Sequence, residues 1–191
     1  MRVVDYKSGS KKFKLHELYY GLNLQMVLYL FTIWKNGKNK YKNVLPAGVL
    51  YMPAGELSST LDKHATEADG EKQKLAQYKM NVFVLEDPQV IAAMEQKVEG
   101  VFIPVEKTKN GEYSKRSSLM KLEELGKLEQ YVEHLVKEMT ELLHEGRIED
   151  LPAYSSGDLS PCEYCEYRSV CGHREEDGHT EICLLYTSRC V

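Results

Sequence analysis

Cysteine is absent from the first 161 residues of this 191-residue chain. A disulfide framework needs cysteines spread along the fold, so such a framework is excluded for most of the chain. The chain also lacks an apolar run long enough to cross a bilayer, because its most apolar stretch, residues 22–34, is short and contains Asn23 and Gln25. No signal peptide is evident at the N-terminus. These absences favour a cytoplasmic protein with no membrane partner.

An excess of positive charge is lacking as well. The formal net charge of −4 argues against a protein that coats nucleic acid by bulk charge, although it leaves room for a local basic track. No internal repeat or low-complexity tract is present. With 42% apolar residues the chain can bury one core, so a single domain is the default expectation.

The first notable pattern is the run RVVDYK at residues 2–7, which is followed by a Ser-Gly turn and predicts a β-strand. Side chains alternate along a strand, so Asp5 and Lys7 point to one face and Tyr6 to the other. A carboxylate that binds a divalent cation, beside an ammonium that positions water, suits metal-assisted hydrolysis. An ordinary surface ion pair is the commoner reason for an isolated Asp-x-Lys. Because this strand has no neighbour upstream, we also expect a fragment that begins in the middle of a domain.

Residues 15–34 have apolar side chains at helical spacing, which places Gln25 and Tyr29 on one helix face. Further along, turn residues and apolar periodicity indicate several more elements. In order, these are a strand within residues 46–53, a charged and partly helical excursion over 54–77, an apolar run over 80–85, a helix from 87 to 96, a strand over 101–105, a polar hairpin or loop over 107–117, and the longest helix over 119–144.

A cysteine cluster occupies residues 160–175, with Cys162, Cys165 and Cys171 at C-x2-C-x5-C spacing. Two thiols separated by two residues can hold one ion from a tight turn, so the spacing predicts a metal centre. Zinc takes four ligands, and His173 would complete such a site. A [4Fe–4S] cluster takes four thiolates, and the candidates for the fourth are the two later cysteines or a cysteine upstream of this chain.

The last nine residues, 183–191, break from the charged sequence before them and look like the translation of a transposon end used in sequencing libraries. We expect these residues to be a non-native tail, which divides the chain into residues 1–182 and 183–191. In that case Cys183 and Cys190 have no native role.

Three of these features occur together in one protein family: Asp5-x-Lys7, Gln25-x3-Tyr29 and the cysteine triplet. Their combination resembles the RecB-type branch of the PD-(D/E)XK nucleases with an iron–sulfur staple, and within it the AddB family of helicase–nuclease subunits. The similarity covers about residues 2–175 and includes the stretches 19–25 (YYGLNLQ), 47–51 (AGVLY), 102–105 (FIPV) and 161–165 (PCEYC).

This resemblance implies an α/β fold, a restriction-endonuclease-like mixed sheet flanked by helices and followed by a cysteine-rich iron–sulfur segment. It also implies a Mg²⁺-dependent DNA exonuclease that works with an AddA-type helicase subunit in double-strand-break repair by homologous recombination.

The resemblance also implies roles for individual residues. Asp5 and the Tyr6 carbonyl would bind Mg²⁺, and Lys7 would orient water or stabilise the phosphorane charge. Gln25 and Tyr29 would support the site and contact DNA. The three clustered cysteines (Cys162, Cys165 and Cys171) would hold a [4Fe–4S] cluster with a fourth ligand far upstream.

Two parts of the family pattern are missing, namely the strand with the other metal-binding Asp and the first cluster cysteine. One carboxylate holds Mg²⁺ weakly, so we expect the 191-residue chain alone to be inactive and poorly stable. Two alternatives remain open. One is the iron–sulfur nuclease of CRISPR spacer acquisition, and the other is a non-catalytic DNA-gripping module in which Asp5 and Lys7 are a relic. The long 90–150 segment favours the helicase–nuclease interpretation.

Overall fold

The computed structural model describes residues 1–8, 13–37, 40–41, 44–54, 66–154 and 159–182. The chain divides into two compact units. The first unit comprises Met1–Phe13 and Leu24–Tyr131, and the second comprises Lys14–Asn23 and Val132–Val191. The expected tail at 183–191 lies outside the described residues.

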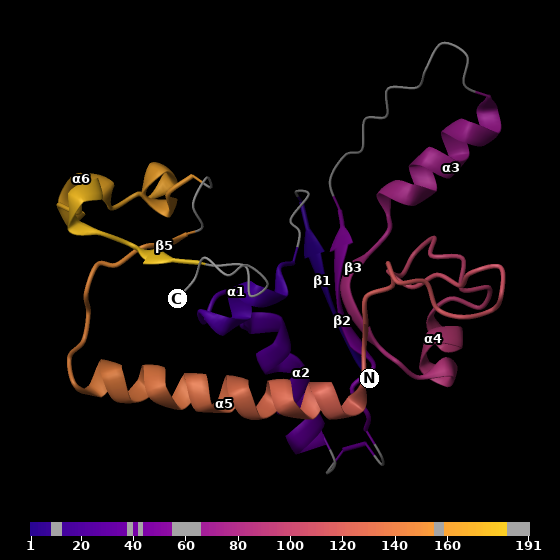
Figure 1. Ribbon diagram of the computed structural model, residues 1–191, viewed down its shortest axis with the longest axis horizontal. Helices are drawn as coiled ribbons and strands as arrows, with labels where there is room; N and C mark the ends of the chain where they lie inside the picture. The colour runs from indigo at the N-terminus through magenta and orange to yellow at the C-terminus, as the bar shows by residue number, and fades with distance from the viewer. Residues whose placement is uncertain (9–12, 38–39, 42–43, 55–65, 155–158, 183–191) are drawn as a thin grey trace. The chain divides into compact units, whose positions relative to one another are not determined.

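The first unit is built on a four-stranded mixed sheet in the order β1-β2-β3-β4 (Figure 1). Its strands are β1 (Arg2–Lys7), β2 (Gly48–Pro53), β3 (Asn81–Leu85) and β4 (Leu119–Met120). The pairing of β1 with β2 is parallel, that of β2 with β3 antiparallel, and that of β3 with β4 parallel. The predicted α/β fold with a mixed sheet flanked by helices is confirmed.

One face of this sheet packs under helix α4 (Pro88–Met94). Its core consists of Leu50, Val84, Ile91, Val98, Ile103 and Val105, with Val4 packed against it. The predicted helix start is confirmed, because Asp87 Oδ1 accepts hydrogen bonds from the Gln89 and Val90 N–H groups at 2.8 and 3.0 Å. The helix ends two residues before the predicted Gln96.

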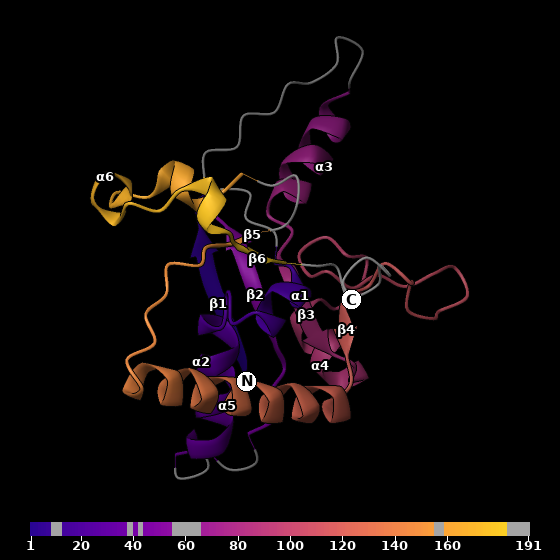
Figure 2. The ribbon, with the colours of Figure 1, turned by 60° about the vertical axis from the view of Figure 1, so that its left-hand side comes forward.

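Helix α2 (Gln25–Asn36) covers the opposite face and contacts β1 and β2 (Figures 1 and 2). Its buried side chains are Met26, Val27, Leu30 and Phe31. Because Val4 and Leu50 face α4, the alternating residues Asp5, Lys7 and Tyr51 face the α2 side of the sheet.

The prediction of one continuous helix over residues 15–34 is wrong. The structure has α1 (Leu15–Tyr19) and then α2, because Gly21 and Asn23 adopt left-handed backbone angles with φ of +77° and +57°. A left-handed residue cannot continue a right-handed helix, and glycine and asparagine are the residues that adopt this conformation most readily. Gln25 therefore begins a helix and does not lie in the middle of one.

The predicted strand at 101–105 is also wrong. Its backbone N–H groups do not pair with a neighbouring strand; three of them donate to the carboxylate of Glu95 at the end of α4. The donors are Val101, Phe102 and Ile103, at 3.0, 2.9 and 3.1 Å. A side chain that occupies these donors removes the hydrogen bonds a strand would need.

The long helix α5 (Leu122–His144) begins three residues later than predicted, because β4 takes up Leu119 and Met120. Glu124 Oε2 accepts a hydrogen bond from the Lys121 N–H at 2.8 Å and caps this helix start. Gly146, with φ of +76°, follows its end as predicted. Helix α3 (Glu67–Gln77) accounts for the helical part of the 54–77 excursion, whereas residues 55–65 lie outside the described part.

The second unit holds a pair of short parallel strands, β5 (Ala153–Tyr154) and β6 (Thr180–Glu181). Between them lie the 3-10 turns η2 (Pro161–Tyr164) and η3 (Glu175–Asp177) and the short helix α6 (Arg168–Cys171). Across the described ranges of the chain, no helix combines the length and apolar character that a membrane crossing requires.

Candidate active site

Asp5 and Lys7 lie at the end of β1, on the same face of the sheet. The Lys7 Nζ atom is 2.5 Å from Asp5 Oδ2, and the two side chains keep 27% and 33% of their surface exposed. The pleat of the strand brings the two groups together, as the alternation of side chains predicts. The ion pair is therefore both accessible and held by a strand that is anchored in the sheet.

The charge state of Lys7 follows from this contact. The hydrogen bond with Asp5 raises the pKa of Lys7, partial removal from water lowers it, and the negative charge of Asp5 raises it again. The net pKa is above the ordinary value of 10.5. At neutral pH Lys7 is a cation that has no free pair of electrons with which to accept a proton. It can therefore orient water or stabilise negative charge, but it cannot act as a general base.

Tyr51 on β2 completes this part of the sheet face. It lies opposite Asp5 in the parallel pairing and is only 3% exposed. The Lys7 Nζ atom lies 5.0 Å from the centroid of the Tyr51 ring, and the Phe13 ring meets Tyr51 edge-on at 6.0 Å. A cation over an aromatic face is attracted to it, so Tyr51 restrains the Lys7 ammonium beside Asp5.

Two oxygen atoms on this face are shielded from solvent. Within the described ranges, Asp5 Oδ2 has no partner other than Lys7, and Asn81 Oδ1 on β3 has no hydrogen-bond partner. A buried acceptor without a donor costs about 1–3 kcal/mol. Asn81 pairs with Tyr51 in the sheet and therefore shares the face of Asp5. Sequence reasoning missed Tyr51 and Asn81, because only the strand register aligns them with Asp5.

The oxygen donors at this strand end fit Mg²⁺, which prefers carboxylate and carbonyl oxygens. Asp5 supplies a carboxylate that is satisfied only by Lys7, and the neighbouring Tyr6 supplies a backbone carbonyl. The Tyr6 side chain is exposed and faces away from Asp5. No group of three or more His, Cys, Asp or Glu side chains suited to a metal ion occurs among the described residues. Asp5 is therefore a single carboxylate that would need oxygens from water or phosphate as well.

Gln25 and Tyr29 lie on the first turns of α2. The Gln25 Nε2 atom donates a hydrogen bond to Tyr29 Oη at 3.0 Å, and Tyr29 is 51% exposed. The four-residue spacing thus joins the two side chains, as predicted for a helix. In the described part of the structure, no hydrogen bond or ion pair connects them with Asp5 or Lys7. Their polar groups are open to solvent, so this pair is accessible to a ligand.

In the second unit, Cys162 lies within η2, Cys165 follows that turn and Cys171 ends α6. The Cys165 N–H donates to the Cys162 carbonyl at 3.4 Å, so the two residues share one turn, as their spacing predicts. All three are free thiols, and Cys165 and Cys171 are exposed. Ser160 Oγ caps η2 by accepting from the Cys162 N–H at 3.3 Å.

The donor types in this segment suit an iron–sulfur cluster or zinc. His173, whose side chain is mostly buried, has Nδ1 3.5 Å from Asp150 Oδ2, and Cys171 Sγ lies 4.0 Å from the same oxygen. These distances belong to separate pairs, since the described chain holds no assembled group of three metal-ligating side chains. Cys183 and Cys190, the two later candidates, lie outside the described residues.

Comparison with known proteins gives the family. The model of the PD-(D/E)XK nuclease superfamily matches residues 1–172. The chain is 35% identical, over 99% of its length, to the B-type ATP-dependent helicase/deoxyribonuclease subunit of Acetivibrio thermocellus. It is 36% identical, over 90% of its length, to the protein of the same name from Bacillus thuringiensis. The chain spans only 17% and 15% of the length of these two relatives. With its mixed sheet and this match, the chain belongs to the PD-(D/E)XK nuclease superfamily.

Proposed function

We propose that this chain is a DNA-cleaving domain of a helicase–nuclease complex, which hydrolyses phosphodiester bonds with Mg²⁺ as an exonuclease. The observation that carries the proposal is the Asp5–Lys7 pair at 2.5 Å on an accessible strand end of a nuclease-superfamily chain. The names of the relatives, which join helicase and deoxyribonuclease, support a helicase partner and DNA as substrate. Double-strand-break repair by homologous recombination is the process we propose for such a complex.

The division of labour among the residues follows from their chemistry. Asp5 and the Tyr6 carbonyl would hold Mg²⁺, which when bound polarises a phosphate oxygen and makes its bound water more acidic. Lys7 stays protonated and stabilises the negative charge that develops on the phosphoryl oxygens. Tyr51 restrains Lys7 from the neighbouring strand. The exposed Gln25–Tyr29 pair is proposed to contact the DNA beside the site.

Asp5→Asn in the intact helicase–nuclease tests this proposal. The amide keeps the shape of the side chain but removes the charge that attracts the cation, so the Mg²⁺ concentration for half-maximal cleavage should rise at least tenfold. DNA binding should remain, and chelation of the metal should abolish cleavage by the unmodified enzyme. Cleavage of labelled DNA across a Mg²⁺ titration measures the first effect, and binding in the presence of a chelator measures the second.

The matched control is Glu123→Gln, which neutralises an exposed carboxylate on α5 that is likewise paired with a lysine. This variant should cleave like the unmodified enzyme. If Asp5→Asn leaves the Mg²⁺ dependence unchanged as well, the pair is not catalytic, and the non-catalytic DNA-gripping module becomes the better interpretation.

For the second unit we propose that Cys162, Cys165 and Cys171 hold a [4Fe–4S] cluster with a fourth thiolate, with zinc and His173 as the alternative. The free state of all three thiols and the shared turn of the first two support a metal-binding role. The residues would tie their segment around the cluster and so stabilise the second unit.

Metal analysis of the anaerobically purified intact enzyme distinguishes these two centres. An iron–sulfur cluster should give iron, acid-labile sulfide and a broad visible absorption that is lost in Cys165→Ser. Ser160→Ala, which removes a neighbouring side-chain hydroxyl that is not a ligand, should keep the colour. A colourless protein that contains one zinc would overturn the iron–sulfur assignment.

A further inference from the structure

The predicted polar hairpin is a well-defined element of the first unit, formed by residues 106–117 and named here the basic hairpin. Lys107 forms a bridge with Tyr113, and the Thr108 N–H donates to the Glu112 carbonyl at 2.7 Å. Gly111 has φ of +83° at the tip, which glycine adopts without strain. At the base, the Ser114 N–H donates to the Glu106 carbonyl at 2.9 Å. The hairpin is therefore held by its own hydrogen bonds.

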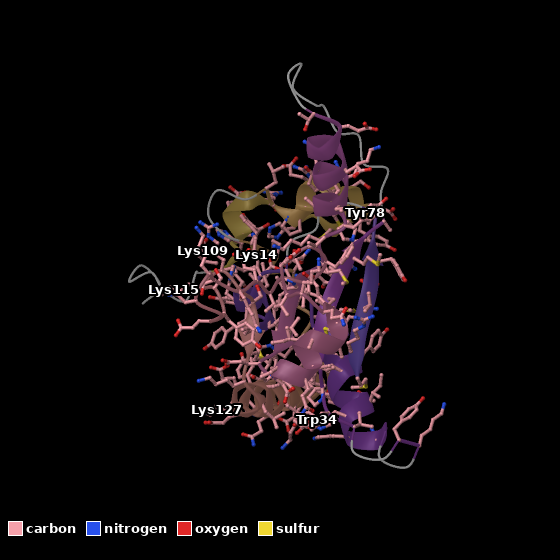
Figure 3. All side chains as sticks on the ribbon, turned by 90° about the vertical axis from the view of Figure 1, so that its right-hand side faces the viewer. Lys14, Trp34, Tyr78, Lys109, Lys115 and Lys127 are labelled. Atoms are coloured by element: carbon pink, nitrogen blue, oxygen red, sulfur yellow. The ribbon has the colours of Figure 1, made fainter. Side chains whose placement is uncertain are left out.

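The charge of this hairpin is opposite to that of the whole chain. Residues 107–116 contain one acidic residue, Glu112, and four basic ones, whereas the chain has a net charge of −4. The basic residues are Lys107, Lys109, Lys115 and Arg116, and all four are exposed. Lys109 and Lys115 are labelled in Figure 3, where they lie at the margin of the side chains drawn.

These basic groups also differ from other exposed lysines in their partners. On α5, Lys127 pairs with Glu123 at 2.8 Å and Lys137 with Glu141 at 3.7 Å. Within the described part of the chain, no basic residue of the hairpin pairs with a carboxylate, and the ring of Tyr113 lies 5.8 Å from Lys107 Nζ. A cation without a carboxylate partner loses no ion pair when it binds a phosphate. The hairpin is thus prepared for a polyanion, and the lysines of α5 are not.

We propose that the basic hairpin binds the phosphate backbone of DNA and so holds the substrate strand independently of its sequence. The proposal rests on the proposed function, because it takes DNA as the substrate. Phosphate is the group that lysine and arginine recognise without reading bases, and its binding releases counterions from the nucleic acid. The hairpin would add affinity for DNA and take no part in bond cleavage.

The test is the salt dependence of DNA binding by the 191-residue chain, measured as fluorescence anisotropy with a labelled duplex and the matching single strand. The variant changes Lys109, Lys115 and Arg116 to Gln, which removes three positive charges and keeps side-chain length. Each lost phosphate contact lowers the slope of log affinity against log salt by about 0.9 for duplex and 0.7 for single strands. The triple variant should therefore reduce the slope by about 2 to 3 and weaken binding at least tenfold.

The matched control changes Lys74, Lys127 and Lys137 to Gln and so removes the same charge from exposed positions on α3 and α5. This variant should bind nearly as the unmodified chain does. Glu112→Gln removes the one acidic side chain among residues 107–116 and should tighten binding, a gain that a damaged fold cannot produce. Circular dichroism confirms that each variant is folded.

Equal losses in the two triple variants would overturn the proposal, because bulk charge would then explain the binding. Unchanged DNA affinity would also overturn it. If the hairpin variant bound DNA normally but separated from the helicase partner in pull-down assays, the surface would be a protein-docking site. No DNA binding by the unmodified chain would contradict both the hairpin proposal and the proposed function, whereas a loss confined to the hairpin concerns the hairpin alone.

Discussion

Lys7→Ala is expected to slow DNA cleavage by the intact enzyme about 10²- to 10⁴-fold at saturating Mg²⁺ and DNA. The ammonium lies 2.5 Å from Asp5 Oδ2 and 5.0 Å from the centroid of the Tyr51 ring, so its position is restrained before substrate binds. Such a charge contributes mainly when negative charge develops in the transition state. Single-turnover cleavage should therefore lose rate, while the affinity for DNA changes little.

Two comparisons make this expectation specific. Lys7→Arg keeps a positive charge but has a longer, planar head group, so it should restore only part of the rate. Lys127→Ala, which breaks an exposed ion pair on α5, should leave cleavage unchanged. The double variant of Lys7→Ala with Asp5→Asn should lose little more than the worse single variant, because the two groups act as a unit. Full activity in Lys7→Ala would remove this residue from the mechanism.

The protonation state of Lys7 adds a pH expectation to the same experiment. Because contact with Asp5 raises the pKa of Lys7 above 10.5, its favourable interaction is fully present below that pH and is lost only as the pH rises through the raised value. No loss of cleavage below pH 10.5 should therefore trace to Lys7. If a decline at lower pH disappears in Lys7→Arg, the assigned charge state is wrong.

Glu95→Gln is expected to lower the free energy of unfolding by about 2 kcal/mol or more, since hydrogen bonds to a charged group contribute about 1.5–3 kcal/mol each in mutational series. Glu95 is 9% exposed, and its carboxylate accepts from Val101, Phe102 and Ile103. Glutamine offers one acceptor oxygen and turns an amide group toward the remaining donors. Urea denaturation of the 191-residue chain measures the loss, and Glu123→Gln on the exposed side of α5 should change stability little.

The same carboxylate predicts how stability depends on pH. Burial raises the pKa of Glu95, but the hydrogen bonds from Phe102, Val101 and Ile103 lower it further, and the net pKa lies below the ordinary value of 4.5. A lowered pKa in the folded state means that this stabilisation is present above pH 4.5 and is lost as the pH falls through the lower value. Glu95→Gln should flatten that part of the acid profile. An unchanged profile would show that Glu95 is not the group responsible.

Local rules accounted for the parts of the candidate site that lie close together in the sequence. The period of two along a strand placed Asp5 and Lys7 on one face, and the helical spacing joined Gln25 to Tyr29. The Asp87-Pro88 pair likewise marked the start of α4. Each of these depends on residues no more than four apart, so the backbone geometry of one element decides it.

The sequence by itself thus determined the strand with its charged pair, the Gln-Tyr pair, the basic hairpin and the family pattern. Only the tertiary structure decided that Tyr51 lies opposite Asp5 and that Glu95 takes the N–H groups of the predicted strand at 101–105. These features arise where distant segments meet. Strand register and the capture of backbone donors by a buried side chain depend on packing across the whole sheet, and no local periodicity encodes them.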